Sequence, residues 1–407
     1  MLQRSARSLG CWGRFFRAAI VLGGLSVFSS ELLLSQKSAP SKASNQALEQ
    51  AASAARERGE IDESIKLYER ALEHEPSWQE GWWYDGSLHY DQSQYPAAVR
   101  SFRKLVQLNS ELSDAWAMLG LSEYECQDYA DSFKDLEKAT AEGTALEDSL
   151  RKIVDYHRAL LLNARGDSDA AYMVLSSLFL QGVHSEDLQV ALGMSLLRVP
   201  VYPSQLDPTR DALVHDAGNI AAFMTQKQFD KAEVAFHDLL KQYPNVPYIH
   251  YAFGAMLAAN GRDHDAEDQF VAETQVNPDS ALPYMEWSFV ESKAKHYSDS
   301  VDLARKAVDR SQDSFMAHYL LGNGLLMSGD ATAARPELET AQKLAPEVAD
   351  IRYSLSRVYA RLGEPALAKQ EQTEFIALQR KNALDRVKLK RLYPNAQSIT
   401  GVRPTTN

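Results

Sequence analysis

Small residues recur along this chain at a fixed interval of 34 residues. The interval runs through two series: Ser64, Ala98 and Ser132, and then Ala232, Ala266, Ser300, Ala334 and Ala368. Self-similarity at a period of this length is the signature of a solenoid, in which each unit is one supersecondary element that stacks on its neighbours. We therefore expect the 407 residues to form an elongated array and not one large globular core.

Each period has the pattern of two helices joined by a glycine-containing break. Apolar residues recur at spacings of three and four in segments such as "SIKLYERALEHEP" at 64–76, a pattern that predicts amphipathic helices and not strands. Glycine ends a helix without strain because it tolerates positive φ. The predicted breaks lie at Gly59, Gly166, Gly261, Gly329 and Gly363.

The repeat resembles a known family, the tetratricopeptide repeat, whose unit has the pattern W-x2-L-G-x2-Y followed by Ala, an aromatic residue and Pro. "WAMLG" at 116–120 reproduces the first part with Trp116, Leu119 and Gly120. The aromatic position of the second helix is filled by Tyr68, Phe102, Phe236 and Phe270. The resemblance implies an all-α, right-handed α-solenoid of antiparallel helix hairpins that acts as a protein-interaction scaffold.

Nine units can be aligned, and two joins between units break the period, with steps of 39 and 61 residues. The second join contains "RVPVYPSQLDPT" at 198–209, whose three prolines cannot continue a helix. We expect about four hairpins over 47–182, an unpaired helix and a proline-rich join over 183–212, and about five hairpins over 213–380. The remaining residues, 381–407, are predicted to complete a basic cap helix and end in a disordered tail.

The stretch "GWWYDGSLHY" at 81–90 places two tryptophans side by side. The resemblance implies that Trp82 packs between the helices of its hairpin, whereas Trp83 faces a concave groove. The same assignment places further side chains along that groove, namely Tyr90, Tyr124, Tyr156, Tyr251, Met285, Phe289, Tyr319 and Tyr353. We expect an aromatic groove that binds peptide segments of other proteins through apolar anchors. Alternatively, some of these rings only fill contacts between neighbouring units.

Signatures of catalysis, of a metal site and of cofactor binding are missing from the sequence. The ten histidines form no H-E-x-x-H motif, and the chain has no C-x2-C pair, no phosphate-binding glycine loop and no G-x-S-x-G. His264 lies among acids in "GRDHDAED", where a solvated helix N-terminus explains the carboxylates. We therefore predict no enzymatic activity, no catalytic residue, no metal site and no cofactor.

The charge balance bears on the class of partner. The net charge is −12, whereas nucleic-acid binders present a basic face, so we expect no nucleic-acid partner. The basic stretch "RKNALDRVKLKRLYP" at 380–394 could contact an anionic membrane or an acidic partner. A charged helix cap is the plainer interpretation.

The N-terminus has the pattern of a targeting segment. Four arginines and no acid precede Glu31, and the apolar run "AAIVLGGLSVF" covers 18–28, as in a signal peptide with a cut near residue 29. Residues 1–30 are predicted to be this signal or a membrane anchor, followed by a flexible linker at 31–46. An uncleaved tether through 18–35 and an organellar transit peptide stay open as alternatives.

These alternatives give two predicted locations. A cleaved chain would be exported to a periplasmic or extracellular space, whereas an uncleaved chain would be anchored in the inner membrane. In the second case the protein would be an accessory subunit of a secretion, envelope-assembly or membrane-enzyme complex.

Overall fold

The computed structural model describes residues 40–141 and 146–392, and every regular element in these ranges is a helix. The predicted all-α fold is therefore confirmed. The predicted signal or anchor at 1–30 and the end of the tail lie outside the described residues. Among the helices of the described ranges, none combines the length and apolar character that a bilayer crossing requires.

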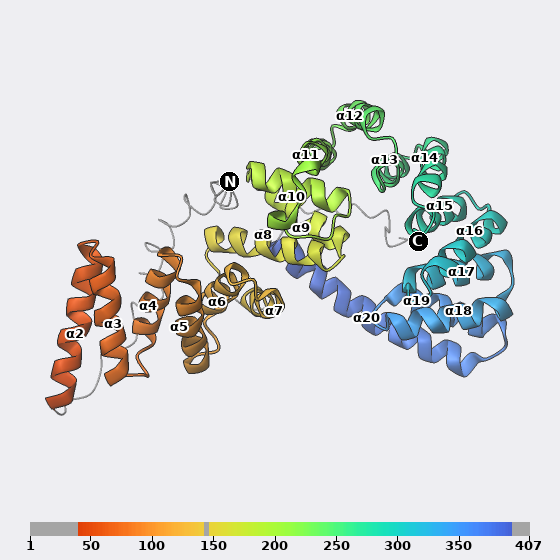
Figure 1. The fold of residues 1–407 in the computed structure, drawn as a ribbon. Coiled ribbons are helices and arrows are strands. Elements are labelled where there is room, and N and C mark those ends of the chain that lie inside the picture. Colours follow the sequence, from red (N-terminus) through yellow and green to blue (C-terminus); the bar gives the residue numbers. More distant parts are fainter. Residues whose placement is uncertain (1–39, 142–145, 393–407) are drawn as a thin grey trace. The chain divides into compact units, whose positions relative to one another are not determined.

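The chain divides into two compact units. The first unit contains the described residues up to Asp167, together with Ser185–Leu188 and Val201–Gln205. Its helices pair in sequence as hairpins α2/α3, α4/α5 and α6/α7, followed by α8 (Figure 1). Their bounds are α2 (Pro40–Glu57), α3 (Ile61–His74), α4 (Gln79–Asp91), α5 (Tyr95–Leu108), α6 (Ser113–Glu125), α7 (Tyr129–Ala139) and α8 (Asp148–Ala164).

The second unit begins with α9 (Ser168–Leu180) and most of α10 (Glu186–Leu196), and continues after the proline-rich join. Five hairpins follow: α11/α12, α13/α14, α15/α16, α17/α18 and α19/α20 (Figure 1). Their bounds are α11 (Asp211–Thr225), α12 (Phe229–Gln242), α13 (Ile249–Ala259), α14 (Asp263–Val276), α15 (Leu282–Lys293), α16 (Tyr297–Arg310), α17 (Phe315–Ser328), α18 (Ala331–Leu344), α19 (Ala349–Arg361) and α20 (Pro365–Leu392). The join holds two short 3-10 turns, η1 (Pro203–Gln205) and η2 (Pro208–Arg210).

The periodic small residues lie where the two helices of a hairpin cross, and those that are serines add a hydrogen bond. Ser64 Oγ donates to the Ala52 carbonyl at 2.9 Å, and Ser132 Oγ donates to the Gly120 carbonyl at 2.7 Å. In both cases the acceptor lies 12 residues earlier, on the first helix of the same hairpin. A buried hydroxyl is thereby satisfied without a larger side chain at the crossing.

Glycine on the first helix permits the same close approach. A Cβ added at Gly120 would lie 2.7 Å from Leu136 Cγ, and one at Gly254 would lie 2.6 Å from Phe270 Cε1. The predicted glycine breaks are also confirmed, since all five have positive φ, between 75° and 100°. The period therefore encodes both the hairpin crossing and the turn that makes it possible.

Three domain assignments from the sequence differ from the structure. Helix α9 falls in the second unit and not in an array ending at 182, because the Tyr172 hydroxyl donates to the Ala221 carbonyl on α11 at 3.1 Å. Helix α10 is not unpaired, because it crosses α11 where a Cβ on Gly193 would lie 1.9 Å from the Val214 carbonyl oxygen. The predicted flexible linker is helical from Pro40, since proline suits the first helical position and alanines follow.

Candidate functional site

Of the two adjacent tryptophans, Trp83 is more buried than predicted, whereas Trp82 packs against the buried core cluster. Trp83 is buried, with 8% of its surface exposed, and its ring meets Phe102 edge-on at 5.8 Å. Trp82 is half-buried, and its Nε1 donates to the Pro76 carbonyl at 2.9 Å. Trp116, one period later, makes the same bond to the Ser110 carbonyl at 2.8 Å. Trp83 is buried because α4 turns this position toward its hairpin partner α5.

The other predicted groove residues divide between the two units. Trp83, Tyr90, Tyr124 and Tyr156 belong to the first unit, and Tyr251, Met285, Phe289, Tyr319 and Tyr353 belong to the second. Tyr156 is buried, Tyr353 is 47% exposed, and the rest of the set besides Trp83 is half-buried. Rings that fill contacts between neighbouring helices thus account for much of the set. Their role in binding peptides stays a prediction.

A repeated aromatic contact closes two of the hairpin turns in the first unit. Tyr90 at the end of α4 meets Tyr95 at the start of α5 at 5.4 Å, edge to face. Tyr124 and Tyr129 repeat this contact one period later at 5.3 Å. The predicted groove residues Tyr90 and Tyr124 therefore also stabilise the turn of their own hairpin.

Around Tyr124 the structure gathers a larger group, which we call the tyrosine recess: Tyr124, Tyr129 and His157. The Tyr124 ring lies 4.8 Å from the His157 ring on α8. Tyr202, from the proline-rich join, stacks on Tyr129 with ring centroids 3.6 Å apart and planes at 18°, and meets Tyr124 edge-on at 6.3 Å. Tyr202 thus occupies the recess.

The segment that carries Tyr202 is itself folded into one turn. The Gln205 backbone N–H donates to the Tyr202 carbonyl at 2.8 Å, and Pro203 lies between them. A side-chain hydrogen bond joins Ser204 to Tyr129. An aromatic ring, a proline turn and one polar contact therefore hold Val201–Gln205 against the hairpins of the first unit.

The recess is uncharged at neutral pH. Burial lowers the pKa of His157 to about 4, although the hydrogen bond with the Ile153 carbonyl opposes the shift. The bond is 2.8 Å long and involves Nδ1, which must carry the proton because a carbonyl only accepts. Burial also raises the pKa of Tyr124 far above its ordinary value. Neutral aromatic walls of this kind suit an apolar or aromatic side chain.

In the second unit, Tyr251 belongs to a charged cluster. Arg198 Nη2 contacts both carboxylate oxygens of Asp169 at 2.6 Å, and its guanidinium lies 5.3 Å from the centre of the Tyr251 ring. Glu286 faces the same group, and burial raises its pKa to about 7, with Asp169 adding to the shift and Arg198 opposing it. Tyr251 is therefore engaged by a cation from the join.

The remaining predicted residues of the second unit lie further along it. Met285, Phe289 and Tyr319 pack against one buried apolar cluster, and Tyr319 shares a hydrogen bond with Ser354. Tyr353 meets Phe375 on α20, with ring centroids 5.3 Å apart. Helices α15, α17 and α19, each the first helix of its hairpin, therefore carry these aromatic and thioether side chains.

No sequence pattern singles out Tyr129, His157, Tyr202 or Arg198 as site residues. Tyr202 and Arg198 both lie in "RVPVYPSQLDPT" at 198–209, the segment that interrupts the period. The interruption was visible, and an aromatic and a basic residue inside it were available as a signal. The residues that Tyr202 and Arg198 contact could not be predicted, because no repeat pattern describes the path of this segment.

Comparisons with known proteins agree with the repeat. A tetratricopeptide-repeat model matches residues 49–113, 85–147 and 319–374, and a second one matches 220–245. Anaphase-promoting complex subunit 3 of Schizosaccharomyces pombe is 21% identical over 286 residues, which is 67% of this chain. The chain spans 41% of the length of that relative.

Solved structures with similar folds have low sequence identity. MamA from Desulfovibrio magneticus RS-1 is 19% identical, covering 41% of this chain and 94% of its own, with a TM-score of 0.38. The APC/C hetero-tetramer Cut9-Hcn1 is 12% identical, covering 88% and 94%, with a TM-score of 0.35. The hairpin architecture, the 34-residue period and the two matching models agree, and the chain belongs to the tetratricopeptide-repeat family.

Proposed function

We propose that this protein is a non-enzymatic interaction scaffold that binds peptide segments of partner proteins between aromatic side chains. The observation that supports this most directly is the stacking of Tyr202 on Tyr129 at 3.6 Å inside the tyrosine recess. A short segment from outside the repeats, Val201–Gln205, is held there by the Tyr202 ring and by the Ser204–Tyr129 hydrogen bond. These contacts support the proposal that the recess recognises an aromatic side chain of a partner segment.

The contacts of Val201–Gln205 describe the partner chemistry. A matching segment would present an aromatic residue followed by proline, since proline restricts the unbound peptide and lowers the entropic cost of ordering it. The aromatic ring would supply most of the buried area at a small rotamer cost. A hydroxyl or amide after the proline would take the place of Ser204 beside Tyr129.

Tyr202 competes with any such partner because it is part of the same chain. A short tether gives an effective concentration in the millimolar range, so a partner peptide of ordinary affinity would have to displace it. Removing the ring should open the recess without touching its walls. Tyr202 is half-buried and directly precedes the 3-10 turn η1, outside the hairpins, so the fold should tolerate the variant.

The test is peptide binding to the full chain and to its Tyr202→Ala variant. A fluorescent peptide of the sequence RVPVYPSQLDPT is titrated with each protein, and its anisotropy is followed. We expect the variant to bind at least tenfold more tightly than the parent, and a peptide with alanine for tyrosine to bind neither. Equal affinity for both peptides would refute aromatic recognition.

A second variant guards against indirect effects. Tyr129→Ala removes the stacking wall, and in the background of Tyr202→Ala it should abolish the gain. Tyr297→Ala, at a half-buried tyrosine of the second unit outside the predicted groove, serves as the matched control and should leave recess binding unchanged.

The arginine-rich, apolar N-terminus adds a location to this proposal: the scaffold would act outside the cytoplasm, exported or tethered. Fractionation of cells that express a C-terminally tagged chain, with mass spectrometry of the mature N-terminus, tests this. A start near residue 30 in a soluble exported fraction supports export. An intact N-terminus in membranes would favour an anchored accessory subunit, and an intact soluble chain in the cytoplasm would reject both.

A further inference from the structure

A cleft of about 710 Å³ opens in the first unit between α3, α4 and α5. Its lining includes carboxylates and a histidine, Glu69, Asp85 and His89, together with the bases Arg100, Arg103 and Lys104. None of these residues belongs to the tyrosine recess. The cleft is therefore a separate feature that the proposed function leaves unexplained.

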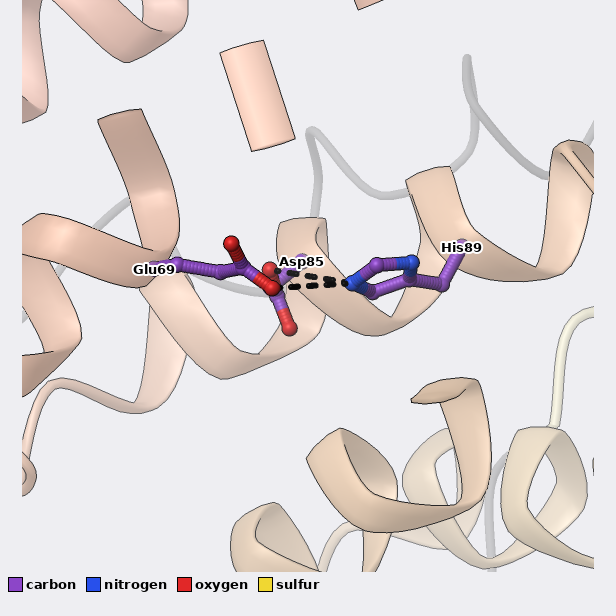
Figure 2. A group of neighbouring side chains, drawn as sticks. All are labelled: Glu69, Asp85 and His89. Carbon is purple, nitrogen blue, oxygen red and sulfur yellow. Dashed lines mark ion pairs between the residues drawn. The ribbon is translucent and has the colours of Figure 1, made fainter. Parts of the chain in front are cut away.

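Two helices bring the carboxylates and the imidazole together. Asp85 and His89 are four residues apart on α4, so both side chains project from the same face of that helix. Glu69 reaches them from α3, and Figure 2 shows both carboxylates pointing toward the imidazole. His89 Nε2 lies 3.6 Å from Glu69 Oε1 and 3.7 Å from Asp85 Oδ1.

These separations are too long for hydrogen bonds but suit ligands of one ion. Hydrogen bonds between nitrogen and oxygen span about 2.7–3.2 Å. Ligands at about 2.1 Å from a tetrahedral zinc ion lie about 3.4 Å from each other. The two nitrogen–oxygen separations are therefore close to those of ligands that share one zinc ion, and all three candidate ligand atoms lie within 4.8 Å of one another.

The outer partners of the ligands have the arrangement that metal sites use. His89 Nδ1 lies 2.6 Å from Gln94 Oε1, and because that amide oxygen accepts, Nδ1 carries the proton and Nε2 faces the carboxylates. The Ser101 hydroxyl donates to Asp85 Oδ2 at 2.6 Å, leaving Oδ1 directed inward. A ring nitrogen and a carboxylate fixed from behind in this way are typical of metal ligands.

Asp85 gives the strongest indication that this cluster binds an ion. Its side chain is 4% exposed, yet Oδ1 has no hydrogen-bond partner among the described residues. Leaving a buried carboxylate oxygen unsatisfied costs free energy. One period later the same position is Leu119, a core residue. The repeat that contains Asp85 therefore has an acid where the next repeat has an apolar core residue, and the contacts of this acid within the protein do not satisfy both of its oxygens.

We propose that Glu69, Asp85 and His89 bind a divalent transition-metal ion of the zinc class through Oε1, Oδ1 and Nε2. An imidazole among the ligands favours zinc-like ions over magnesium and calcium, which select oxygen donors. Three protein ligands leave a coordination position open, and Glu69 is the ligand nearest to solvent, with its side chain 53% exposed.

A second group of similar composition provides a matched control. Glu291, His296 and Asp299 also lie close enough to share an ion, but the His296 side chain is 63% exposed and bonds directly to Glu291 at 2.8 Å. It has the ordinary geometry of a surface ion pair. Any weak metal binding there should be separable by mutation.

The experiment measures zinc binding to the full chain, produced without a polyhistidine tag. Calorimetric titration with Zn²⁺ and the visible spectrum of the Co²⁺ form are recorded for the parent, for His89→Gln and Asp85→Asn, and for the control His296→Gln. We expect tight one-to-one binding in the parent and in the control. Each cluster variant should weaken it at least tenfold and remove the cobalt d–d band.

Asp85→Leu separates loss of metal from loss of fold. It restores the residue type of the next unit, so the apo protein should unfold at the same denaturant concentration as the parent or a higher one, while zinc no longer raises the midpoint. Absence of zinc binding in the parent would overturn the proposal. So would tight binding that persists in both His89→Gln and Asp85→Asn.

Discussion

Arg103 and Glu123 form an ion pair of 2.7 Å at the two positions that Glu69 and His89 occupy one period earlier. Glu339 and Tyr359 make a 2.9 Å hydrogen bond at the matching positions of the second unit. In each case the second helix of one hairpin is joined to the first helix of the next. The repeat thus keeps the contact and changes its chemistry, and at the Glu69–His89 pair the buried Asp85 carboxylate lies beside the imidazole.

The burial of Glu123 beside Arg103 predicts that the free energy of unfolding depends on pH. Burial raises the pKa of Glu123 to about 7, while Arg103 opposes the shift. A carboxyl whose folded pKa exceeds its unfolded value binds protons more tightly when folded, so its contribution to the free energy of unfolding falls as pH rises from about 4.5 to about 7. Urea titrations across that window should show a smaller decline for Glu123→Gln than for the parent, by up to about 3 kcal/mol. A parallel decline in both proteins would contradict the shift.

The hairpin crossing predicts intolerance of bulk at Gly120. A Cβ there would lie 2.7 Å from Leu136 Cγ and 3.1 Å from the Leu136 backbone nitrogen. Gly120→Leu should therefore lower the free energy of unfolding by at least about 1–3 kcal/mol through overpacking. Ala130→Leu, on an exposed face of α7, is the control and should change it by less than about 0.5 kcal/mol. Chemical denaturation measures both, and equal midpoints would show that the crossing can relax.

The join predicts a structural role for Arg198, whose side chain is only 13% exposed. Arg198→Met keeps an apolar stem but removes the cation from Asp169 and from the Tyr251 ring. We expect a loss of about 1–2 kcal/mol in the stability of the second unit, measured by denaturation or hydrogen exchange of α13. Asp169→Asn should cost less, because that carboxylate is 52% exposed and surface pairs contribute little. A larger loss of stability in the Asp169 variant than in the Arg198 variant would contradict the structural role predicted for Arg198.

Cys126 is predicted to react slowly with alkylating agents. Burial raises the pKa of its thiol, and Asp128, Glu123 and Glu125 raise it further, so less of the nucleophilic thiolate is present. Iodoacetamide at pH 8 should modify Cys126 more slowly in the folded chain than in the denatured chain, as followed by peptide mass spectrometry. Asp128→Asn should speed the folded reaction. A faster reaction in the folded parent would show that the thiol is activated.

The 34-residue period allowed the hairpins, the turns and the crossings to be predicted from the sequence. Each of these depends on contacts within one unit or with the next: Gly120 meets Leu136 sixteen residues later, and Ser132 bonds to Gly120 twelve residues earlier. Because such contacts are local, a spacing in the sequence translates directly into a spacing in the structure.

Tertiary packing decided which face of each helix is buried. Trp82 and Trp83 are neighbours, yet adjacent residues on a helix point about 100° apart, so a small rotation of α4 determines which ring is buried. The same rotation directs Asp85 and His89 into the cleft. An alignment to the family pattern identifies equivalent positions in the repeats, but it does not give the rotation of α4 about its own axis.

The sequence by itself determined the architecture of this protein, because a repeat restates the same short-range contacts many times. Which residues meet at its two candidate sites was decided by the tertiary structure. Tyr202 reaches Tyr129 across 73 residues along a segment with no period, and Glu69 joins Asp85 and His89 from a different helix. Such meetings depend on how non-repeating parts pack, and packing is a property of the whole folded unit.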